Sequence, residues 1–206
     1  MKITSAIFDF SAPDYASCPR ETVPEFALIG RSNVGKSTLL NRLAAHPNLA
    51  RISDKPGFTK TLNFYTINRR WRLVDLPGYG FARISHAERA RYTRLIEEYL
   101  LKRKILAGVL VLLDSSLAPQ TVDLDFVRWI GLAGRPFALV FTKADKAKGN
   151  AAAEHVTQFQ SAISGWFQGT PDVFVVSAKS EVGLSELQHS IAAVAGGGAL
   201  LEGEAR

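Results

Sequence analysis

Short apolar runs alternate along the chain with longer segments whose apolar residues recur every three or four positions. The runs have the length of β-strands and lie at residues 26–29, 62–67, 71–75, 107–113, 137–141 and 173–176. The longer segments have helical spacing and lie at residues 37–45 and at about 85–104, 121–133, 151–167 and 184–195. Alternation of this kind predicts a mainly parallel sheet with helices on both faces.

Two details refine this α/β prediction. The strands at 62–67 and 71–75 are separated only by a turn-like Asn-Arg-Arg, which predicts an antiparallel hairpin. Ser85 precedes Glu88 by three residues, a capping-box pattern that starts the long helix after it. We therefore expect six strands, one of them antiparallel to the others, with ligand sites at the carboxyl ends of the parallel strands.

The composition fits one globular domain with short ends. The 206 residues are 47% hydrophobic, which is enough for a substantial core. We predict a domain at 25–195, an N-terminal extension at 1–24 that is dispensable to the core, and a flexible tail at 196–206. No apolar run reaches the roughly 20 residues of a membrane-spanning helix, and no signal-peptide region precedes Asp9. With a lone Cys18, we expect a cytoplasmic protein without a membrane partner.

One segment carries the net charge of +6. Residues 69–104 hold ten Lys and Arg against four Asp and Glu, whereas the rest of the chain is balanced. This segment predicts an anionic partner, and a solvated helix face with a basic surplus is the alternative. The helical spacing of its apolar residues predicts core contacts by Tyr92, by Leu95 or Ile96, and by Tyr99, with base-stacking as the alternative. The candidates for phosphate contact are Arg83, Arg89, Arg91, Arg94, Lys102, Arg103 and Lys104.

The strand at 26–29 leads directly into GRSNVGKS, residues 30–37, which matches the phosphate-loop pattern G-x-x-x-x-G-K-S/T. Its backbone N–H groups would surround the phosphates, and Lys36 would add a positive charge at the β and γ oxygens. The Ser37 hydroxyl would bind Mg²⁺. The loop predicts a nucleotide site.

The strand at 71–75 ends in DLPG, residues 75–78. Asp75 would reach the metal through a water, and the Gly78 N–H would bond the γ-phosphate. A loop that begins here could therefore order or relax with the nucleotide state.

Two further motifs favour guanine over adenine. TKAD, residues 142–145, follows a strand, and Asp145 can accept from the guanine N1–H and 2-amino groups, which adenine lacks. SAK, residues 177–179, also follows a strand, and the Ala178 N–H could bond guanine O6. These motifs favour GTP and disfavour a P-loop kinase.

Four such motifs in this order resemble the translation-factor-related class of P-loop GTPases. GRSNVGKS, KPGFTKTLNFY, DLPGYGFA, TKAD and SAK together resemble the EngB (YihA/YsxC) family of bacterial GTP-binding proteins, over about residues 26–194. The resemblance implies a three-layer Ras-like G domain that hydrolyses GTP to GDP. It also implies a role in assembly of the large ribosomal subunit, with links to cell division and septation, and a precursor rRNA partner for residues 69–104.

The resemblance also assigns roles within the site. It implies Mg²⁺ bound by Ser37 and by Thr59 of the first switch, with Thr61 as the nearby alternative. The predicted catalytic residues are Lys36, Thr59, Gly78 and Asn33. The predicted nucleotide contacts are Gly30, Arg31, Ser32, Asn33, Val34, Gly35, Lys36, Ser37, Thr38, Gly57, Phe58, Thr59, Lys60, Thr61, Asp75, Leu76, Pro77, Gly78, Thr142, Lys143, Ala144, Asp145, Ser177, Ala178 and Lys179.

Two positions depart from the commonest GTPase pattern. Thr142 stands where Asn is usual, although threonine is usual in this family. Its hydroxyl is shorter and loses the paired bonding of an amide, so we expect moderate nucleotide affinity.

Tyr79 stands where many GTPases carry a water-orienting Gln. A K⁺ bound by Asn33 or a docked partner could supply the missing help, while bracing of the loop is the other interpretation of Asn33. We expect slow turnover by the isolated protein, on the order of 10⁻⁴ s⁻¹ or somewhat faster.

Two other functions remain open from the residues. One is a cell-division regulator with protein partners, for which the basic segment is only surface. The other is a GTP-binding module with negligible turnover. We expect a monomer.

Overall fold

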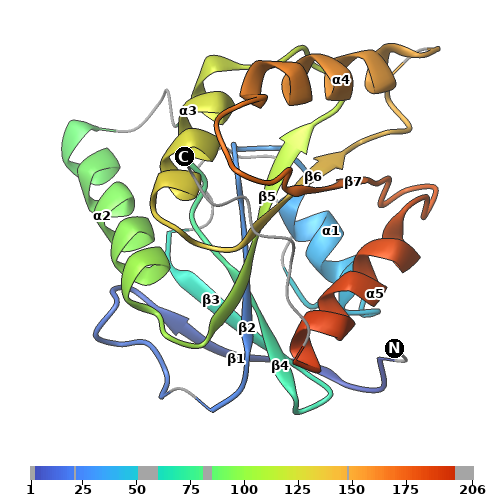
Figure 1. Cartoon of the computed structure of the whole chain (residues 1–206). Helices are drawn as coiled ribbons and strands as arrows, with labels where there is room; N and C mark the ends of the chain where they lie inside the picture. The colour runs from blue at the N-terminus through green and yellow to red at the C-terminus, as the bar shows by residue number, and fades with distance from the viewer. Residues whose placement is uncertain (1–2, 21, 51–59, 81–84, 148, 198–206) are drawn as a thin grey trace.

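The computed structural model describes residues 3–20, 22–50, 60–80, 85–147 and 149–197 (Figure 1). Within these ranges, one seven-stranded sheet has the order β1-β3-β4-β2-β5-β6-β7. The strands are β1 (Ala6–Ala12), β2 (Glu25–Gly30), β3 (Leu62–Ile67), β4 (Trp71–Asp75), β5 (Leu106–Asp114), β6 (Phe137–Thr142) and β7 (Asp172–Val175). The helices are α1 (Lys36–Leu43), α2 (His86–Lys102), α3 (Thr121–Leu132), α4 (Ala151–Ile163) and α5 (Leu184–Ala195).

Strand β3 runs antiparallel to both of its neighbours, β1 and β4, and the remaining pairings are parallel. The α/β class and the single antiparallel strand are confirmed. The strand count of six is wrong because β1 of the N-terminal extension adds a seventh strand at the edge of the sheet. Ile7, Phe8 and Phe10 of β1 are exposed and only Ala12 is fully buried, so this strand lacks the alternation of a half-buried strand.

Residues of the N-terminal extension also belong to the core. Ala12 is packed with buried residues of β3 and α2, and β1 pairs with β3 from Ala6 to Ala12. The expectation that residues 1–24 are dispensable to the core is therefore wrong for this strand.

Helices cover both faces of the sheet, as the alternation predicts. On one face, α2, α3 and α4 pack their apolar sides against Ala27, Ile29 and Val111 (Figure 1). On the other face, α1 and α5 pack against Phe26 and Leu28. Because successive side chains of β2 point to opposite faces, this one strand contributes to both halves of the core.

The helix boundaries differ from the sequence prediction by a few residues. The capping box of α2 is present, since the Ser85 side chain and Glu88 exchange hydrogen bonds with each other's backbone N–H groups. Helix α4 ends at Ile163 and not near 167, because Gly165 has a φ of 82° and turns the chain. Within the described part of the chain, no helix is long and apolar enough to cross a membrane.

Candidate nucleotide-binding site

The predicted motifs meet at the end of the sheet where the parallel strands finish. Strands β2, β4, β5, β6 and β7 run parallel, so their carboxyl ends lie at the same edge. Gly30 ends β2, Asp75 ends β4 and Thr142 ends β6, while Ser177 is the second residue after β7. The position of the motifs after strands, expected from the sequence, is confirmed.

The phosphate loop runs from Gly30 to the start of α1. A Cβ on Gly30 would lie 2.6 Å from the carbonyl oxygen of Leu112 on β5, so only glycine fits there. Asn33 and Gly35 have φ values of 62° and 99°, which turn the loop into the N-terminus of α1. The hydroxyl of Ser32 is buried with no hydrogen-bond partner among the described residues, which suits a loop that surrounds a polar ligand.

The Lys36 ammonium group forms an ion pair with the Asp75 carboxylate, and both side chains are nearly buried. This contact brings the end of β4 beside the first turn of α1, which also holds Ser37 and Thr38. A hydroxyl and a carboxylate are oxygen ligands of the kind that Mg²⁺ prefers, so Ser37 and Asp75 fit the expected metal.

The Gly78 backbone packs directly against the phosphate loop. A Cβ on Gly78 would lie 2.7 Å from the Gly30 carbonyl oxygen and 3.5 Å from the Ser32 nitrogen. The next residue, Tyr79, forms an isolated parallel β-bridge with Arg31. The second motif therefore lies against the first, as a shared phosphate site requires.

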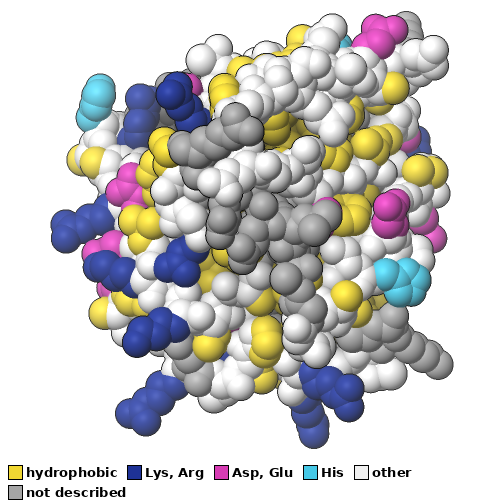
Figure 2. Space-filling model, viewed as in Figure 1, with side chains coloured by type: hydrophobic (Ala, Val, Ile, Leu, Met, Phe, Trp, Pro, Cys, Tyr) yellow, Lys and Arg dark blue, Asp and Glu magenta, His cyan; other side chains and the backbone are white. Residues whose placement is uncertain are grey.

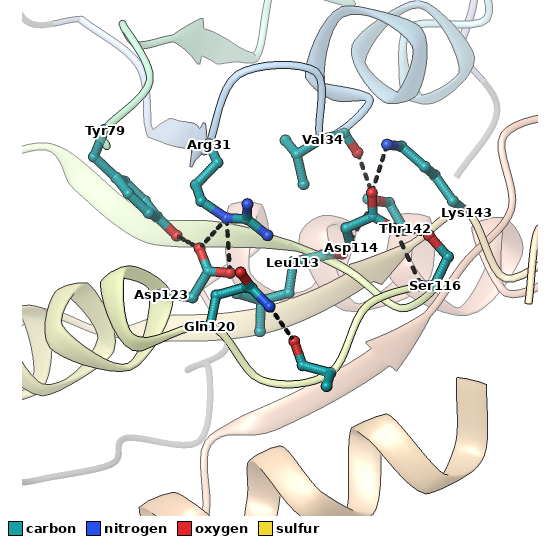
Figure 3. A network of polar contacts seen from close by, with 11 residues as sticks. Arg31, Val34, Tyr79, Leu113, Asp114, Ser116, Gln120, Asp123, Thr142 and Lys143 are labelled. Atoms are coloured by element: carbon teal, nitrogen blue, oxygen red, sulfur yellow. Dashed lines mark hydrogen bonds and ion pairs between the residues drawn. The ribbon is translucent and has the colours of Figure 1, made fainter. Parts of the chain in front are cut away.

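Tyr79 points toward α3. Its hydroxyl donates to Asp123 Oδ1 at 2.9 Å (Figure 3). Its ring is stacked on that of Phe126, with 4.4 Å between centroids. Burial raises the pKa of Tyr79 well above its ordinary value, and the Asp123 charge adds to this effect. The hydroxyl is therefore a protonated donor whose bond is already used within the protein.

Thr142 joins the phosphate loop to β6. Its hydroxyl oxygen lies 2.6 Å from the Val34 carbonyl oxygen and 3.0 Å from that of Leu113, and its one proton can donate to either (Figure 3). The hydroxyl is thus within reach of carbonyl groups of the phosphate loop and of β5, and the moderate nucleotide affinity expected from this residue stays a prediction.

The guanine motifs are held together by Ser177. Its hydroxyl donates to Asp145 Oδ1 at 2.6 Å and accepts from the backbone N–H of Lys179 at 3.2 Å. The hydrogen bond from Ser177 is the main reason that the pKa of Asp145 lies below its ordinary value. Ala144 donates its N–H to the Val176 carbonyl at 3.2 Å, so the TKAD and SAK segments lie side by side.

Sequence reasoning missed Asp114, which orients Lys143. The Lys143 ammonium donates to Asp114 Oδ2 at 2.6 Å, and Ser116 donates to Oδ1 from its hydroxyl at 2.6 Å and from its backbone N–H at 3.1 Å. Burial raises the pKa of Asp114, but the bonds from Lys143 and Ser116 outweigh it and hold the pKa below its ordinary value. Asp114 is the first polar residue after the apolar run at 107–113 and ends β5, and this signal could have found it.

The first switch falls largely outside the described residues. The predicted residues that lie outside are Gly57, Phe58 and Thr59, of which Thr59 is the predicted metal ligand. Lys60 is exposed, and the Thr61 hydroxyl donates to the Asn63 side chain at 3.1 Å.

The basic segment divides into exposed and buried charges. Arg89, Arg91, Arg94 and Lys104 are exposed, whereas Arg103 is buried and pairs with Glu25 through two bonds of 2.7 Å. The expectation that Arg103 faces phosphates is therefore wrong. Arg83 lies outside the described residues. The core prediction for this helix is confirmed: Tyr92 and Tyr99 are buried, and so are both alternatives, Leu95 and Ile96.

A phosphate loop after β2, a carboxylate at the end of β4 and a guanine motif after β6, on a sheet of this order, define the P-loop GTPase class. Comparison with known proteins agrees. The family model described as "50S ribosome-binding GTPase" matches residues 25–143. The sequence is 43% identical to a probable GTP-binding protein EngB of Bacteroides thetaiotaomicron, over 91% of this chain and 93% of that protein. It is 42% identical to the protein of the same description from Flavobacterium psychrophilum, over 91% and 92%. The chain therefore belongs to the EngB family of GTPases, and it binds and hydrolyses GTP.

Solved structures share the fold. The crystal structure of a probable EngB protein matches 83% of this chain and 98% of its own, with a TM-score of 0.63 at 23% identity. Aquifex aeolicus Era bound to GDP·AlF₄⁻ matches 83% of this chain and 56% of its own, with a TM-score of 0.66 at 22% identity. At this identity the likeness supports the fold alone.

Proposed function

We propose that this GTPase is a nucleotide-dependent switch in assembly of the large ribosomal subunit, acting as a cytoplasmic monomer. The observation that carries the proposal is the exposed basic side of α2, the helix that follows the second switch motif. The matching family model is described as ribosome-binding, and an Era protein that shares this fold has been solved in complex with 16S ribosomal RNA.

Within the site, each motif has a proposed role in hydrolysis. Lys36 leaves Asp75 and neutralises the β and γ phosphates, while the Gly78 N–H bonds the γ-phosphate. Mg²⁺ would be held by Ser37 and Thr59, and by Asp75 through a water, and would neutralise charge between the phosphates. Asp145 selects guanine, with Lys143 covering one side of the base.

We also propose that Asn33 binds a K⁺ that assists hydrolysis, with a docked ribosomal partner as the alternative source of help. The orientation of Tyr79 toward Asp123 supports the need for such help, because this side chain is engaged away from the phosphates. Turnover measured in Na⁺, in K⁺ and with precursor particles separates the two. Asn33→Ala should abolish a K⁺ stimulation and leave GDP affinity within about twofold.

No acceleration by K⁺ or by particles would favour a GTP-binding module with negligible turnover. Stimulation by K⁺ that survives in Asn33→Ala would exclude this side chain as the ligand and leave the rest of the proposal standing.

The proposed RNA surface is the exposed side of α2. Figure 2 shows Lys and Arg side chains gathered on the side of the molecule where α2 lies, with acidic side chains between them. Arg91 and Arg94 line a cavity of about 490 Å³ between α2 and the segment that follows β1. Arg94 is 80% exposed and lies 3.8 Å from Glu98, a contact that a phosphate could replace.

Salt-dependent co-sedimentation with precursor 50S particles tests this surface. The charge reversals Arg89→Glu, Arg91→Glu and Arg94→Glu together should abolish binding, whereas Arg91→Ala should reduce the dependence of log K on log salt by about 1. The matched control reverses Arg69 and Arg70, which are also exposed but lie in the β3–β4 turn, at the other end of the sheet from the nucleotide site. Unchanged binding by the α2 variant would refute the surface.

The proposal includes a requirement for normal cell division and septation, as a consequence of ribosome assembly. Depletion followed over time by ribosome profiles and by septum counts tests the order of events. Septation defects that precede any loss of 50S particles would favour a division regulator with protein partners.

A further inference from the structure

Asp123 of α3 joins two segments of the nucleotide site. Arg31 of the phosphate loop donates its Nε–H to both carboxylate oxygens of Asp123, at 2.9 and 3.0 Å, and Tyr79 donates its hydroxyl to Oδ1 at 2.9 Å (Figure 3). The three residues lie on three different elements of the chain, and none of the GTPase motifs includes Asp123.

The contacts are shielded from water. The side chain of Asp123 is 5% exposed and that of Arg31 is 23% exposed. Burial raises the pKa of Asp123, while the Arg31 charge and the Tyr79 bond oppose this effect. A buried carboxylate is stabilised by the groups that donate to it. Loss of the Asp123 charge would therefore leave the positive charge of Arg31 without this carboxylate to neutralise it.

Apolar contacts also hold the Tyr79 side chain in place. The Tyr79 ring is stacked on Phe126 with an interplanar angle of 12°, and Phe126 in turn packs against Trp129 at 5.6 Å between centroids. Phe126 follows Asp123 by three residues on α3, so the carboxylate and the ring face the same side of the helix. Tyr79 is thus fixed at its hydroxyl and along its ring.

This anchoring reaches the backbone beside Tyr79. The β-bridge between Arg31 and Tyr79 and the close approach of Gly78 to the Gly30 carbonyl set the distance between the second motif and the phosphate loop. Asp123 binds the side chains of both residues of that bridge. The position of the Gly78 peptide group therefore depends on a residue of α3.

We propose that Asp123 is a positioning residue that sets the discrimination between GTP and GDP. By holding Arg31 and Tyr79 together, it fixes the Gly78 N–H where a γ-phosphate contacts it. GTP has a γ-phosphate and GDP lacks it. Because Asp123 orders the Gly78 N–H before the nucleotide binds, it lowers the free-energy cost of binding GTP and leaves that of binding GDP unchanged. The inference rests on the GTP site and on the proposed role of the Gly78 N–H, and is independent of the ribosome proposal.

The test compares affinities for GDP and a non-hydrolysable GTP analogue by titration calorimetry. In Asp123→Asn the side chain keeps its size but loses its charge and presents an amide donor to Arg31 or Tyr79. We expect the analogue to bind about five- to tenfold more weakly, with GDP affinity changed by less than about twofold. Equal weakening of both nucleotides, or no change, would overturn the proposal, because a merely structural role moves both together.

Two further variants keep the test decisive if Asp123→Asn folds poorly. Tyr79→Phe keeps the ring stack and removes only the hydroxyl, and it should weaken the analogue selectively by about two- to fivefold. Asp125→Asn is the matched control, since Asp125 is an exposed acid on the same helix, and it should bind both nucleotides as the parent does. In the Asp123→Asn/Tyr79→Phe pair, the losses should be smaller than the product of the single effects; independent effects would refute a shared network.

Discussion

A single hydroxyl group connects the phosphate loop to the end of β6. Thr142 is buried, and its oxygen lies near the carbonyl groups of Val34 and Leu113, which belong to two segments that meet at the nucleotide site. A buried carbonyl without a donor costs free energy, so this hydroxyl contributes to stability and to the shape of the loop.

Thr142→Val should therefore weaken GTP and GDP alike. The methyl group keeps the volume but offers no donor, and we expect both affinities to fall about fivefold and the free energy of unfolding to fall by about 1–2 kcal/mol. Nucleotide titration and urea unfolding measure the two effects. Thr142→Ser keeps the hydroxyl and is the control; an equal loss in that variant would point to the methyl group instead.

Asp145 is a second residue whose neighbours define its chemistry. The hydrogen bond from Ser177 lowers its pKa, so the carboxylate remains ionised and accepting across the physiological range. An amide at this position would both donate and accept.

Asp145→Asn should transfer preference from guanine to xanthine nucleotides. Xanthine carries a carbonyl where guanine carries its 2-amino group, so it can accept from the new amide. We expect GTP affinity to fall at least about tenfold and XTP affinity to rise. Competition binding with GTP and XTP measures both, and weak binding of both would contradict the proposed contact of Asp145 with the base.

At the scale of elements, α2 is anchored at its C-terminal end. Glu25 of β2 is fully buried and accepts from Arg103 and from the Tyr99 hydroxyl, the latter at 2.9 Å. Arg103 also donates to the Pro19 carbonyl at 2.9 Å, so the network reaches the N-terminal segment. Because the C-terminal end of α2 is fixed, a movement of the second switch can displace only the N-terminal end of this helix.

Arg103→Met should destabilise the protein strongly. It removes the nearer of two cations from the buried Glu25 carboxylate and leaves Arg72 at 3.5 Å, so we expect a loss of about 3 kcal/mol in the free energy of unfolding, at the lower end for a broken buried pair. Lys104→Met, at the exposed next position, is the control and should change stability by less than about 0.5 kcal/mol. Denaturant unfolding of both variants gives the comparison, and similar stabilities would contradict this account of Glu25.

At the scale of the molecule, folding and nucleotide binding are coupled. The site is assembled from the ends of separate strands, and an unfolded chain does not bring them together. A ligand that binds only the folded state stabilises it by about 2.7 kcal/mol at one hundred times its dissociation constant.

GDP with Mg²⁺ should therefore raise the melting temperature of the protein, and Lys36→Ala should remove most of that increase. In this variant the ion pair with Asp75 is lost and the phosphates lose a positive charge. Calorimetry with and without nucleotide measures the shift. Lys104→Ala should keep it, and a full shift in Lys36→Ala would mean that Lys36 does not contact the phosphates.

The sequence by itself determined the elements and the local motifs. Periodicity located the five helices and the strands of the nucleotide-binding half because local propensity and burial agree there. The phosphate loop, DLPG and TKAD are each continuous in sequence, so their spacing carries their chemistry, and strand order places them at one edge.

Only the tertiary structure decided which distant residues act together. Edge strand β1 has no alternation to detect, because one strand beside it supplies its pairing and most of its side chains face solvent. In the sequence, Arg103 is one of several basic residues expected at the surface, and only the structure places it beside Glu25. Asp123 is 92 residues from Arg31 and 44 from Tyr79. A contact across such separations depends on how α3 packs on the sheet, and no local pattern encodes that packing.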